Sequence, residues 1–342
     1  MAPPPASPRP AAPSWLVWAA LVVVYIVWGS TYLGIRIVVD SMPPLLAAGA
    51  RFLVAGLALS AILMLRGGPA RMRVTRPQLA GAAFVGGALL LVGNGLVSIG
   101  EETVPSALAA LIVGVIPLVV LILRRLAGET ITRAGIGGVV LGFVGLGILV
   151  VPRGIEGTTD LLGMVLLIVA SISWATGSFF SSRLPMPRDA LVSAAYQLML
   201  GGVMLLMTGL VVGEWARVEA GGFSQASIVS LVYLIVFGSV LAYTAYTWLL
   251  QNAPISRVAT YAYVNPVVAV VLGVFVLDER LDPVMIIGAI LIVASVAFII
   301  RTGSPPAVRD VAVGSAPMRP RGTRMERLRH RVRGSPGRAT GR

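Results

Sequence analysis

Six aromatic or amide side chains stand deep inside long apolar segments of this sequence, where they offer aromatic faces and neutral hydrogen-bonding groups. They are Trp28, Asn94, Trp174, Tyr243, Tyr246 and Tyr263. Aromatic faces stack on flat organic groups, and hydroxyl and amide groups donate or accept hydrogen bonds. The set therefore suits reversible binding of a small, partly apolar organic molecule. The alternative for each residue is packing or hydrogen bonding between helices, and the sequence leaves both open.

Groups that carry out covalent or metal chemistry are missing from the same apolar segments. No Asp, Glu or His lies near the middle of one, the single histidine is His330, and the chain has no cysteine. No cluster of carboxylate, imidazole or thiolate groups is there to bind a metal ion. No Walker A motif is there to bind the phosphates of ATP. We therefore expect no catalytic residue, no metal and no cofactor.

The elements that hold these residues are apolar runs long enough to cross a bilayer. The 342 residues are 57% hydrophobic and 12% charged, with a mean hydropathy of +0.90, whereas a soluble domain is roughly 25% charged. This composition excludes an ordinary soluble domain and a disordered main body. A transmembrane helix needs about 20 apolar residues, and the runs do not alternate in polarity as barrel strands do. We expect ten transmembrane helices, at 15–38, 45–65, 78–100, 104–123, 134–151, 161–182, 190–213, 226–250, 255–277 and 284–300.

The arginines set the expected orientation in the membrane. All 27 basic residues are arginines, and most of those in loops follow the even-numbered segments. Positively charged loops stay on the cytoplasmic side. We therefore expect a multi-pass plasma-membrane protein with both termini in the cytoplasm.

The two ends of the chain differ in composition from the main body. Residues 1–14 are rich in Pro and Ala, and residues 302–342 are rich in Pro, Gly and Arg. Both are expected to be disordered, because they cannot form a packed core. The basic tail suits contact with anionic lipid headgroups, although an unstructured tail without a specific partner is the simpler alternative. Because the basic excess lies on a tail rather than on a folded face, we expect no nucleic-acid partner.

The main body contains an internal duplication. The segment around Trp28 recurs 146 residues later around Trp174, and the same offset relates Arg51 to Gln197. An offset of 149 relates Pro105, Pro117 and Asn94 to Pro254, Pro266 and Tyr243. We expect two five-helix repeats, at 15–151 and 160–301. Because five is odd, the second repeat must be inverted in the membrane, an arrangement typical of secondary transporters with a binding site near the midplane.

Two prolines mark candidate hinges between these repeats. Pro117 and Pro266 each follow another proline by 12 residues, which places them about 18 Å into a helix at ~1.5 Å per residue. A proline at that depth removes one backbone hydrogen bond and bends the helix. We expect a pair of hinges, with two static kinks as the alternative.

Arg51 is the clearest charge within an apolar segment. It stands seven residues after Pro44, so its side chain can extend to the membrane surface. A charge that stays within the membrane commonly marks a functional site. In that case, Arg51 forms an ion pair with Glu101 or Glu102, or binds an anionic substrate.

Several short motifs together resemble a known family. They are Trp28-Gly29-Ser30-Thr31-Tyr32, Arg51-Phe52, the stretch from Pro117 to Glu129, and Tyr263-Val264-Asn265-Pro266-Val267-Val268-Ala269 leading to Glu279. From about residue 15 to 300 the chain looks like two tandem EamA domains of the drug/metabolite transporter superfamily. The resemblance implies a ten-helix inverted-repeat fold, export of small organic metabolites, and a central cavity lined mainly by helices one, three, four, six, eight and nine. It does not single out one substrate, since amino acids, sugars and drugs all occur in the family.

The expected function is therefore transport, and more specifically export, of small organic metabolites or drugs by alternating access around a midplane cavity. The expected partners are a small-molecule substrate and membrane lipids, with the protein as a monomer or homodimer. The alternative is an integral-membrane enzyme acting on lipid-linked substrates, for which the acid pair Glu101-Glu102 alone is weak support. A receptor or scaffold is a third class, but neither gives the inverted duplication a purpose.

Overall fold

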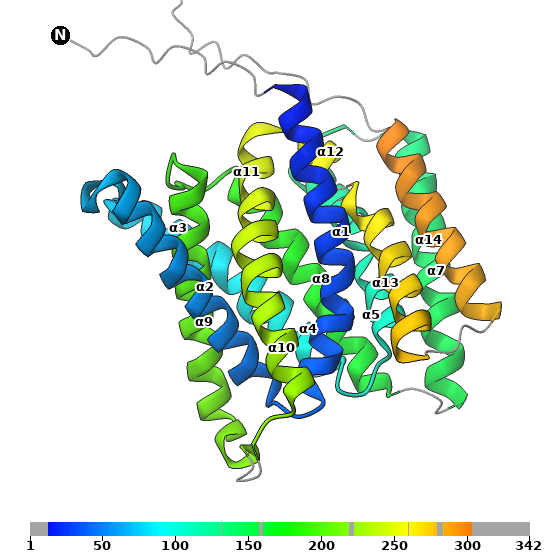
Figure 1. Ribbon diagram of the computed structural model, residues 1–342. Helices are drawn as coiled ribbons and strands as arrows, with labels where there is room; N and C mark the ends of the chain where they lie inside the picture. Colours follow the sequence, from blue (N-terminus) through cyan, green and yellow to red (C-terminus); the bar gives the residue numbers. More distant parts are fainter. Residues whose placement is uncertain are drawn as a thin grey trace, which may run out of the picture. The chain divides into compact units, whose positions relative to one another are not determined.

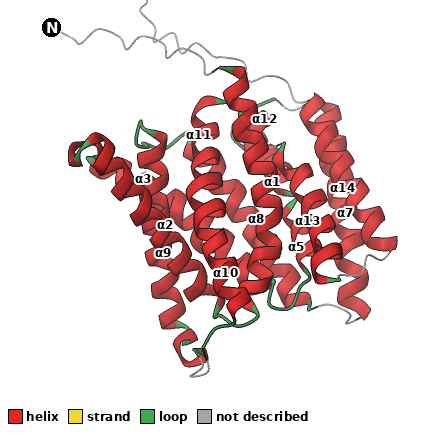
Figure 2. Ribbon diagram, in the orientation of Figure 1, coloured by secondary structure: helices red, strands yellow, loops and turns green. Residues whose placement is uncertain are grey.

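The computed structural model describes residues 13–130, 132–156, 160–218, 222–258, 260–278 and 283–302. The chain divides into two compact units, residues 1–304 and 305–342, and every described residue belongs to the first. Most of the predicted leader and tail, and Glu279, lie outside this part of the chain. Within it the secondary structure is helical, without a strand (Figure 2), which confirms the expected all-α fold.

The first half of the chain contains nine helical elements. Most are α-helices, η1 is a 3-10 helix and η2 is a π-helix. Their bounds are α1 Ser14–Val39, α2 Pro44–Gly67, η1 Pro69–Met72, α3 Arg76–Gly86, η2 Gly87–Asn94, α4 Gly95–Gly100, α5 Ser106–Val113, α6 Ile116–Leu126 and α7 Arg133–Glu156.

The second half follows the same order, with η3 as the 3-10 helix and η4 as the π-helix. Its elements are α8 Leu161–Ser181, α9 Ala190–Val211, η3 Glu214–Arg217, α10 Gln225–Tyr233, η4 Leu234–Tyr243, α11 Thr244–Asn252, α12 Ile255–Val258, α13 Tyr261–Leu277 and α14 Pro283–Thr302.

Seven helical segments in the described residues are long and apolar enough to cross a membrane. They coincide with predicted segments one to four and six to eight. Shorter apolar stretches, Ile136–Ile148, Val264–Leu277 and Ile286–Ser295, lie within predicted segments five, nine and ten. Many large apolar side chains on these helices are exposed, including Leu65, Val211 and Phe275 at over 80%. An apolar surface of this extent is expected where lipid replaces water.

The repeat is visible in elements that hydropathy does not reveal. The 3-10 helices η1 and η3 stand 145 residues apart, and a glycine with positive φ, Gly68 or Gly213, precedes each. The N-caps Thr75 and Ser224 stand 149 residues apart, and each accepts a hydrogen bond from the backbone N–H three residues later. The two π-helices end at Asn94 and Tyr243, also 149 residues apart.

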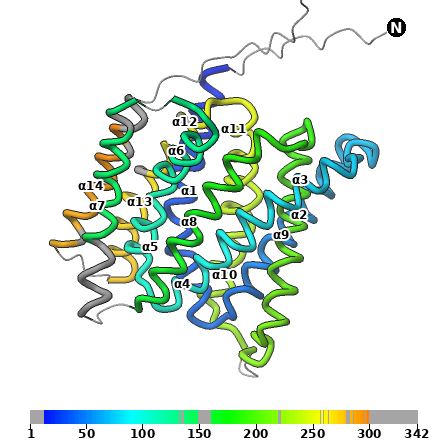
Figure 3. Tube along the Cα trace, turned by 180° about the vertical axis from the view of Figure 1, so that it is seen from behind, coloured from blue at the N-terminus to red at the C-terminus, as the bar shows by residue number. Residues whose placement is uncertain are grey.

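Helix packing follows the same pseudo-symmetry. Equivalent helices pack together in the pairs α2 with α9 and α7 with α14 (Figures 1 and 3). The contact of α1 with α13 is matched by that of α8 with α5 and α6, and the contact of α1 with η4 by that of α8 with η2. Each repeat therefore completes the other, and the central helices come from both.

Glycines allow the closest of these contacts. A Cβ atom at Gly202 of α9 would lie 2.5 Å from the backbone nitrogen of Leu53 in α2. A Cβ atom at Gly29 of α1 would lie 2.5 Å from Cβ of Val268 in α13. Small residues at such positions let transmembrane helices approach closely.

The two candidate hinge prolines sit differently in their helices. Pro266 lies inside the continuous helix α13. Pro117 does not kink a continuous helix: the chain leaves α5 at Val113, and Pro117 stands in the first turn of α6, where its missing N–H costs no helical hydrogen bond. The break lies beside the other proline, since a Cβ atom at Gly114 would lie 3.4 Å from Cγ of Pro266.

Charged residues gather at the ends of the helices. Arg71 binds Asp189 at 2.8 Å, and Glu129 binds both Arg124 and Arg183, at 2.7 and 3.0 Å. Glu129 therefore links the ends of α6 and α8, which supports a structural role for its carboxylate.

Arg36, in the last turn of α1, donates hydrogen bonds to the backbone carbonyls of Glu101 and Glu102, which directly follow α4. The hydrogen bond to Glu102 raises the pKa of Arg217 above its ordinary value. The Glu214 carboxylate accepts from the backbone N–H groups of Leu45 and Leu46, at 3.1 and 2.9 Å, and so caps α2.

Candidate functional site

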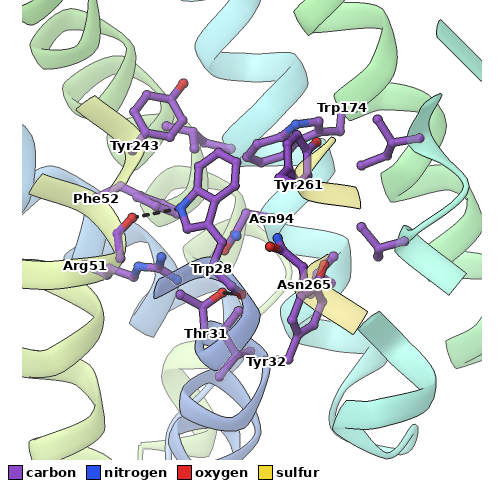
Figure 4. A pocket seen from close by; sticks show the side chains of 16 residues that line it. Trp28, Thr31, Tyr32, Arg51, Phe52, Asn94, Trp174, Tyr243, Tyr261 and Asn265 are labelled. Atoms are coloured by element: carbon purple, nitrogen blue, oxygen red, sulfur yellow. Dashed lines mark hydrogen bonds between the residues drawn. The ribbon is translucent and has the colours of Figure 1, made fainter. Parts of the chain in front are cut away.

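The central feature of the fold is a cluster of five aromatic side chains with Trp28 at its centre. The ring centroid of Trp28 lies 4.7 Å from that of Tyr246, 5.3 Å from Trp174, 5.5 Å from Tyr261 and 6.5 Å from Tyr243. The Trp174 and Tyr261 rings meet it edge to face, the arrangement that the aromatic quadrupole favours. The rings come from α1, α8, η4, α11 and α13, and therefore from both repeats. Figure 4 shows four of them, Trp28, Trp174, Tyr243 and Tyr261.

Repeat symmetry explains why the two tryptophans meet. Trp28 and Trp174 stand at equivalent places on α1 and α8, and each helix packs against the π-helix of the other repeat. Trp28 is 8% exposed, and its Nε1 donates to the carbonyl oxygen of Gly238 in η4 at 3.2 Å. Trp28 is thereby fixed to the second repeat by a hydrogen bond as well as by ring contacts.

A cavity of about 60 Å³ lies against this cluster. We call it the central cavity. Its polar lining comes from five residues in addition to the aromatic cluster: Thr31, Tyr32, Arg51, Asn94 and Asn265 (Figure 4). Apolar side chains, among them Ile35, Phe52, Leu90 and Ile116, complete the wall. A cavity with an apolar wall and a few polar groups is the usual form of a small-molecule site.

Three buried polar atoms around the cavity make no hydrogen bond of ordinary geometry within the described part of the chain. They are Oδ1 of Asn94, Nε1 of Trp174 and the hydroxyl of Tyr261. An unsatisfied buried polar atom costs free energy, about 1–3 kcal/mol each. The side chains of Trp174 and Tyr261 also interact with the Tyr246 hydroxyl, whereas Oδ1 of Asn94 is an acceptor available to a molecule bound in the cavity.

Arg51 lies on the cavity wall and does not extend to a surface. Its side chain is only 4% exposed, and its Nε donates to Oγ of Ser239 at 2.8 Å. The guanidinium lies over the ring of the neighbouring Phe52, 4.5 Å from its centroid. No ion pair formed by the described residues includes Arg51. The cavity wall therefore carries a guanidinium that a neutral hydrogen bond holds and that the Glu101 carboxylate attracts.

The predicted site residues are brought together, with two qualifications. Trp28, Asn94, Trp174 and Tyr243 all line the central cavity. Tyr246 stands behind Trp28 rather than on the cavity wall, and its hydroxyl is 2.8 Å from Oγ of Ser178. Tyr263 lies in α13, and its side chain is outside the part of the chain that the structure describes.

The structure adds Tyr32 and Asn265 to the cavity wall. Each stands four residues after an aromatic residue of the cluster, Trp28 or Tyr261, and so lies on the same helix face. With its amide nitrogen turned toward them, Asn265 donates to the carbonyl oxygens of Tyr25 and Tyr261, at 3.1 and 3.2 Å. Helical spacing from Trp28 and Tyr261 was the sequence signal that could have found both residues.

The arrangement can bind and release a molecule by stacking, hydrogen bonding and one positive charge. Within the described ranges no three His, Cys, Asp or Glu side chains gather in a way that could hold a metal ion.

A model of the EamA-like transporter family matches residues 13–151 and 161–301. The "Uncharacterized inner membrane transporter YedA" of Escherichia coli K12 is 39% identical over 269 residues, which cover 78% of this chain and 85% of YedA. A "Probable amino-acid metabolite efflux pump" of Salmonella typhimurium is 27% identical, over 80% of this chain and 91% of its own length. These names describe transporters rather than enzymes. One crystal structure shares the fold with a TM-score of 0.60 at 18% identity, over 84% of this chain and 96% of its own.

Proposed function

The chain belongs to the EamA-like transporter family, and we propose that it exports small organic metabolites or drugs across the plasma membrane by alternating access of its two repeats around the central cavity. The observation that carries the proposal is the convergence of aromatic rings and unsatisfied polar atoms from both repeats on one buried cavity. A site shared by both repeats can open to either side when one repeat moves against the other.

The direction of transport is proposed from the relatives. The Salmonella typhimurium relative is named as an efflux pump for amino-acid metabolites. Export of a metabolite or toxic compound is therefore the first direction to test.

The side chains around the cavity support a substrate of defined chemistry. Two indole rings and three phenol rings suit a flat or apolar body. Asn94, Trp174 and Tyr261 suit one or two neutral hydrogen-bonding groups, and Arg51 suits one negative or strongly electronegative group. A solute with several charges is disfavoured, since one arginine cannot offset the cost of removing several charges from water.

The test compares cavity tryptophans with a matched tryptophan on the lipid side. Cells lacking their own exporters, and expressing each variant, are challenged with a panel of small toxic metabolites and drugs. Trp28→Ala and Trp174→Ala should weaken resistance to a transported compound about tenfold, because each removes a stacking surface and its buried area. Asn94→Ala should weaken it less. Trp18→Ala in the same helix α1, where Trp18 is 54% exposed, should leave resistance unchanged.

Membrane levels of each variant separate binding from folding. If the tryptophans only pack helices together, Trp28→Ala and Trp174→Ala should lower the amount of folded protein while the remainder keeps normal apparent affinity. Normal affinity and turnover in all three cavity variants would refute this assignment of the site.

A further inference from the structure

A second, larger cavity of about 340 Å³ opens between α8, α9 and α11. It lies where α8 ends, α9 begins and α11 ends, and we call it the vestibule. Its polar lining consists of hydroxyl, amide and guanidinium groups on Ser181, Arg188, Ser193, Gln197, Thr247 and Gln251. It shares no lining residue with the central cavity.

The side chain of Tyr243 connects the walls of the two cavities. The ring of Tyr243 lines the central cavity, whereas its hydroxyl donates to Oε1 of Gln197, a vestibule residue, at 2.7 Å. Nε2 of Gln197 in turn donates to Oγ of Ser193, also on the vestibule wall, at 2.9 Å. Tyr243, Gln197 and Ser193 are all at most 3% exposed. A continuous line of hydrogen bonds therefore runs from the wall of one cavity to that of the other.

Neighbouring rings reinforce this barrier. Tyr246, one turn after Tyr243, is 2% exposed and packs against Trp28 with ring centroids 4.7 Å apart. Its hydroxyl is also held, by Ser178 of α8 at 2.8 Å. The two tyrosines thus tie α8 and α9 to the segment formed by η4 and α11.

The contact between Tyr243 and Gln197 can be broken at low cost. Every hydrogen bond in it joins neutral groups, which exchange partners at far lower cost than a buried ion pair. Tyr243 is also the last residue of the π-helix η4, and π-helical turns within α-helices occur frequently at functional sites. The central cavity, at about 60 Å³, is well below the roughly 300 Å³ of a typical ligand pocket, so a solute must move these walls to enter or leave.

We infer that the cavity between α8, α9 and α11 is the vestibule of the transport path, and that Tyr243 and Gln197 form the gate that closes it from the central cavity. The inference rests on the proposed function, because only that function makes the second cavity part of a transport path. The gate itself is a property of the fold. The polar lining of the vestibule binds the hydrogen-bonding end of the same small, partly apolar solute. Gln197 acts on the solute through Tyr243 and is thus a positioning residue.

The absence of cysteine allows a direct test with single cysteines and a membrane-impermeant thiol reagent. Thr31→Cys introduces a small side chain on the wall of the central cavity, and Gln251→Cys introduces one in the vestibule. Inverted and right-side-out membrane vesicles are both labelled, and the side from which Gln251→Cys reacts promptly defines the vestibule side. From that side Thr31→Cys should react slowly while the gate is closed.

Opening the gate should then expose the central cavity. Adding Tyr243→Phe, which removes the hydroxyl but keeps the ring, should speed labelling of Thr31→Cys from the vestibule side at least tenfold. Gln197→Leu should do the same from the other partner of the bond, which gives a second variant if one of them fails to fold. The matched control is Tyr196→Phe, since the Tyr196 hydroxyl donates to the carbonyl oxygen of Met72, away from both cavities.

The outcomes separate the gate from the proposed function. Equal labelling rates for Thr31→Cys with and without the gate substitutions, whether fast or slow, overturn the gate. No transported compound is needed, so faster labelling in the gate variants supports the gate even if no compound of the panel is exported. Conversely, export with unchanged labelling overturns the gate alone.

Discussion

At the scale of single residues, Arg51 and its repeat partner Gln197 explain how a duplicated chain builds an asymmetric site. Both lie in equivalent helices, α2 and α9, and both are buried and hydrogen-bonded. Arg51 brings a charge to the central cavity, whereas Gln197 brings a neutral amide to the vestibule. The duplication supplied two similar positions, and the change of residue type gave them different roles.

Replacing Arg51 should separate charge recognition from folding. Arg51→Gln removes a buried positive charge that has one protein hydrogen bond, so the folded protein should reach the membrane in near-normal amounts. Transport of a compound with a carboxylate should fall about tenfold or more relative to its neutral amide. Proteoliposome transport of such a matched pair measures this ratio. Arg66→Gln, at the exposed end of α2, is the control, and an equal loss for both compounds would assign Arg51 a purely structural role.

At this scale, two independent sequence patterns selected the same residues, which the structure brings to one cavity. Trp28 and Trp174, and likewise Asn94 and Tyr243, were singled out by both their depth and their repeat spacing, and all four line one cavity. Tyr32, Tyr261 and Asn265 were missed. Helical spacing from Trp28 marks Tyr32, whereas Asn265 stands four residues after Tyr261, which was not among the site residues selected from the sequence. The interruption before Pro117 was missed because hydropathy does not change at Gly114.

At the scale of elements, the long helices followed from hydropathy, whereas the π-helices did not. The pattern of apolar residues reports which segment is buried in lipid but not whether a turn closes with one more residue. The structure places η2 and η4 at equivalent positions, each packed against the first helix of the other repeat. The repeat therefore conserves local backbone geometry that the apolar pattern conceals.

The interface of α2 and α9 should depend on glycine. Gly202→Ala would bring a Cβ atom within 2.5 Å of the backbone nitrogen of Leu53, and such overpacking costs about 1–3 kcal/mol. Thermal unfolding in detergent, followed by size-exclusion chromatography, should show a midpoint lower by several degrees. Gly147→Ala is the matched control, since a Cβ atom there meets nothing within 4 Å and alanine favours a helix. Equal midpoints for the two variants would show that α2 and α9 can move apart enough to admit the Cβ atom at little cost in stability.

At the scale of the whole molecule, the inverted duplication accounts for why the parts pair as they do. Ion pairs at one end, such as Arg71 with Asp189, join the end of the second helix of one repeat to the start of that of the other. In Figure 1 the chain leaves α2 near the top and leaves α9 at the bottom. Equivalent loops therefore belong at opposite membrane faces, and the asymmetry of the arginines predicts which face is cytoplasmic.

Single cysteines at Arg73 and Gly222, 149 residues apart and both exposed, test this orientation. Arg73 follows η1 and Gly222 follows η3 by a few residues, so the two positions are repeat equivalents. In intact cells an impermeant thiol reagent should label Gly222→Cys only, and after the membrane is opened it should also label Arg73→Cys. Arg188→Cys should behave as Arg73→Cys does, because the ion pair of Arg71 with Asp189 holds the two loops at one end of the fold. Labelling of Arg73→Cys and Gly222→Cys from the same side would contradict the inverted repeat, since equivalent loops of two inverted repeats lie on opposite membrane faces.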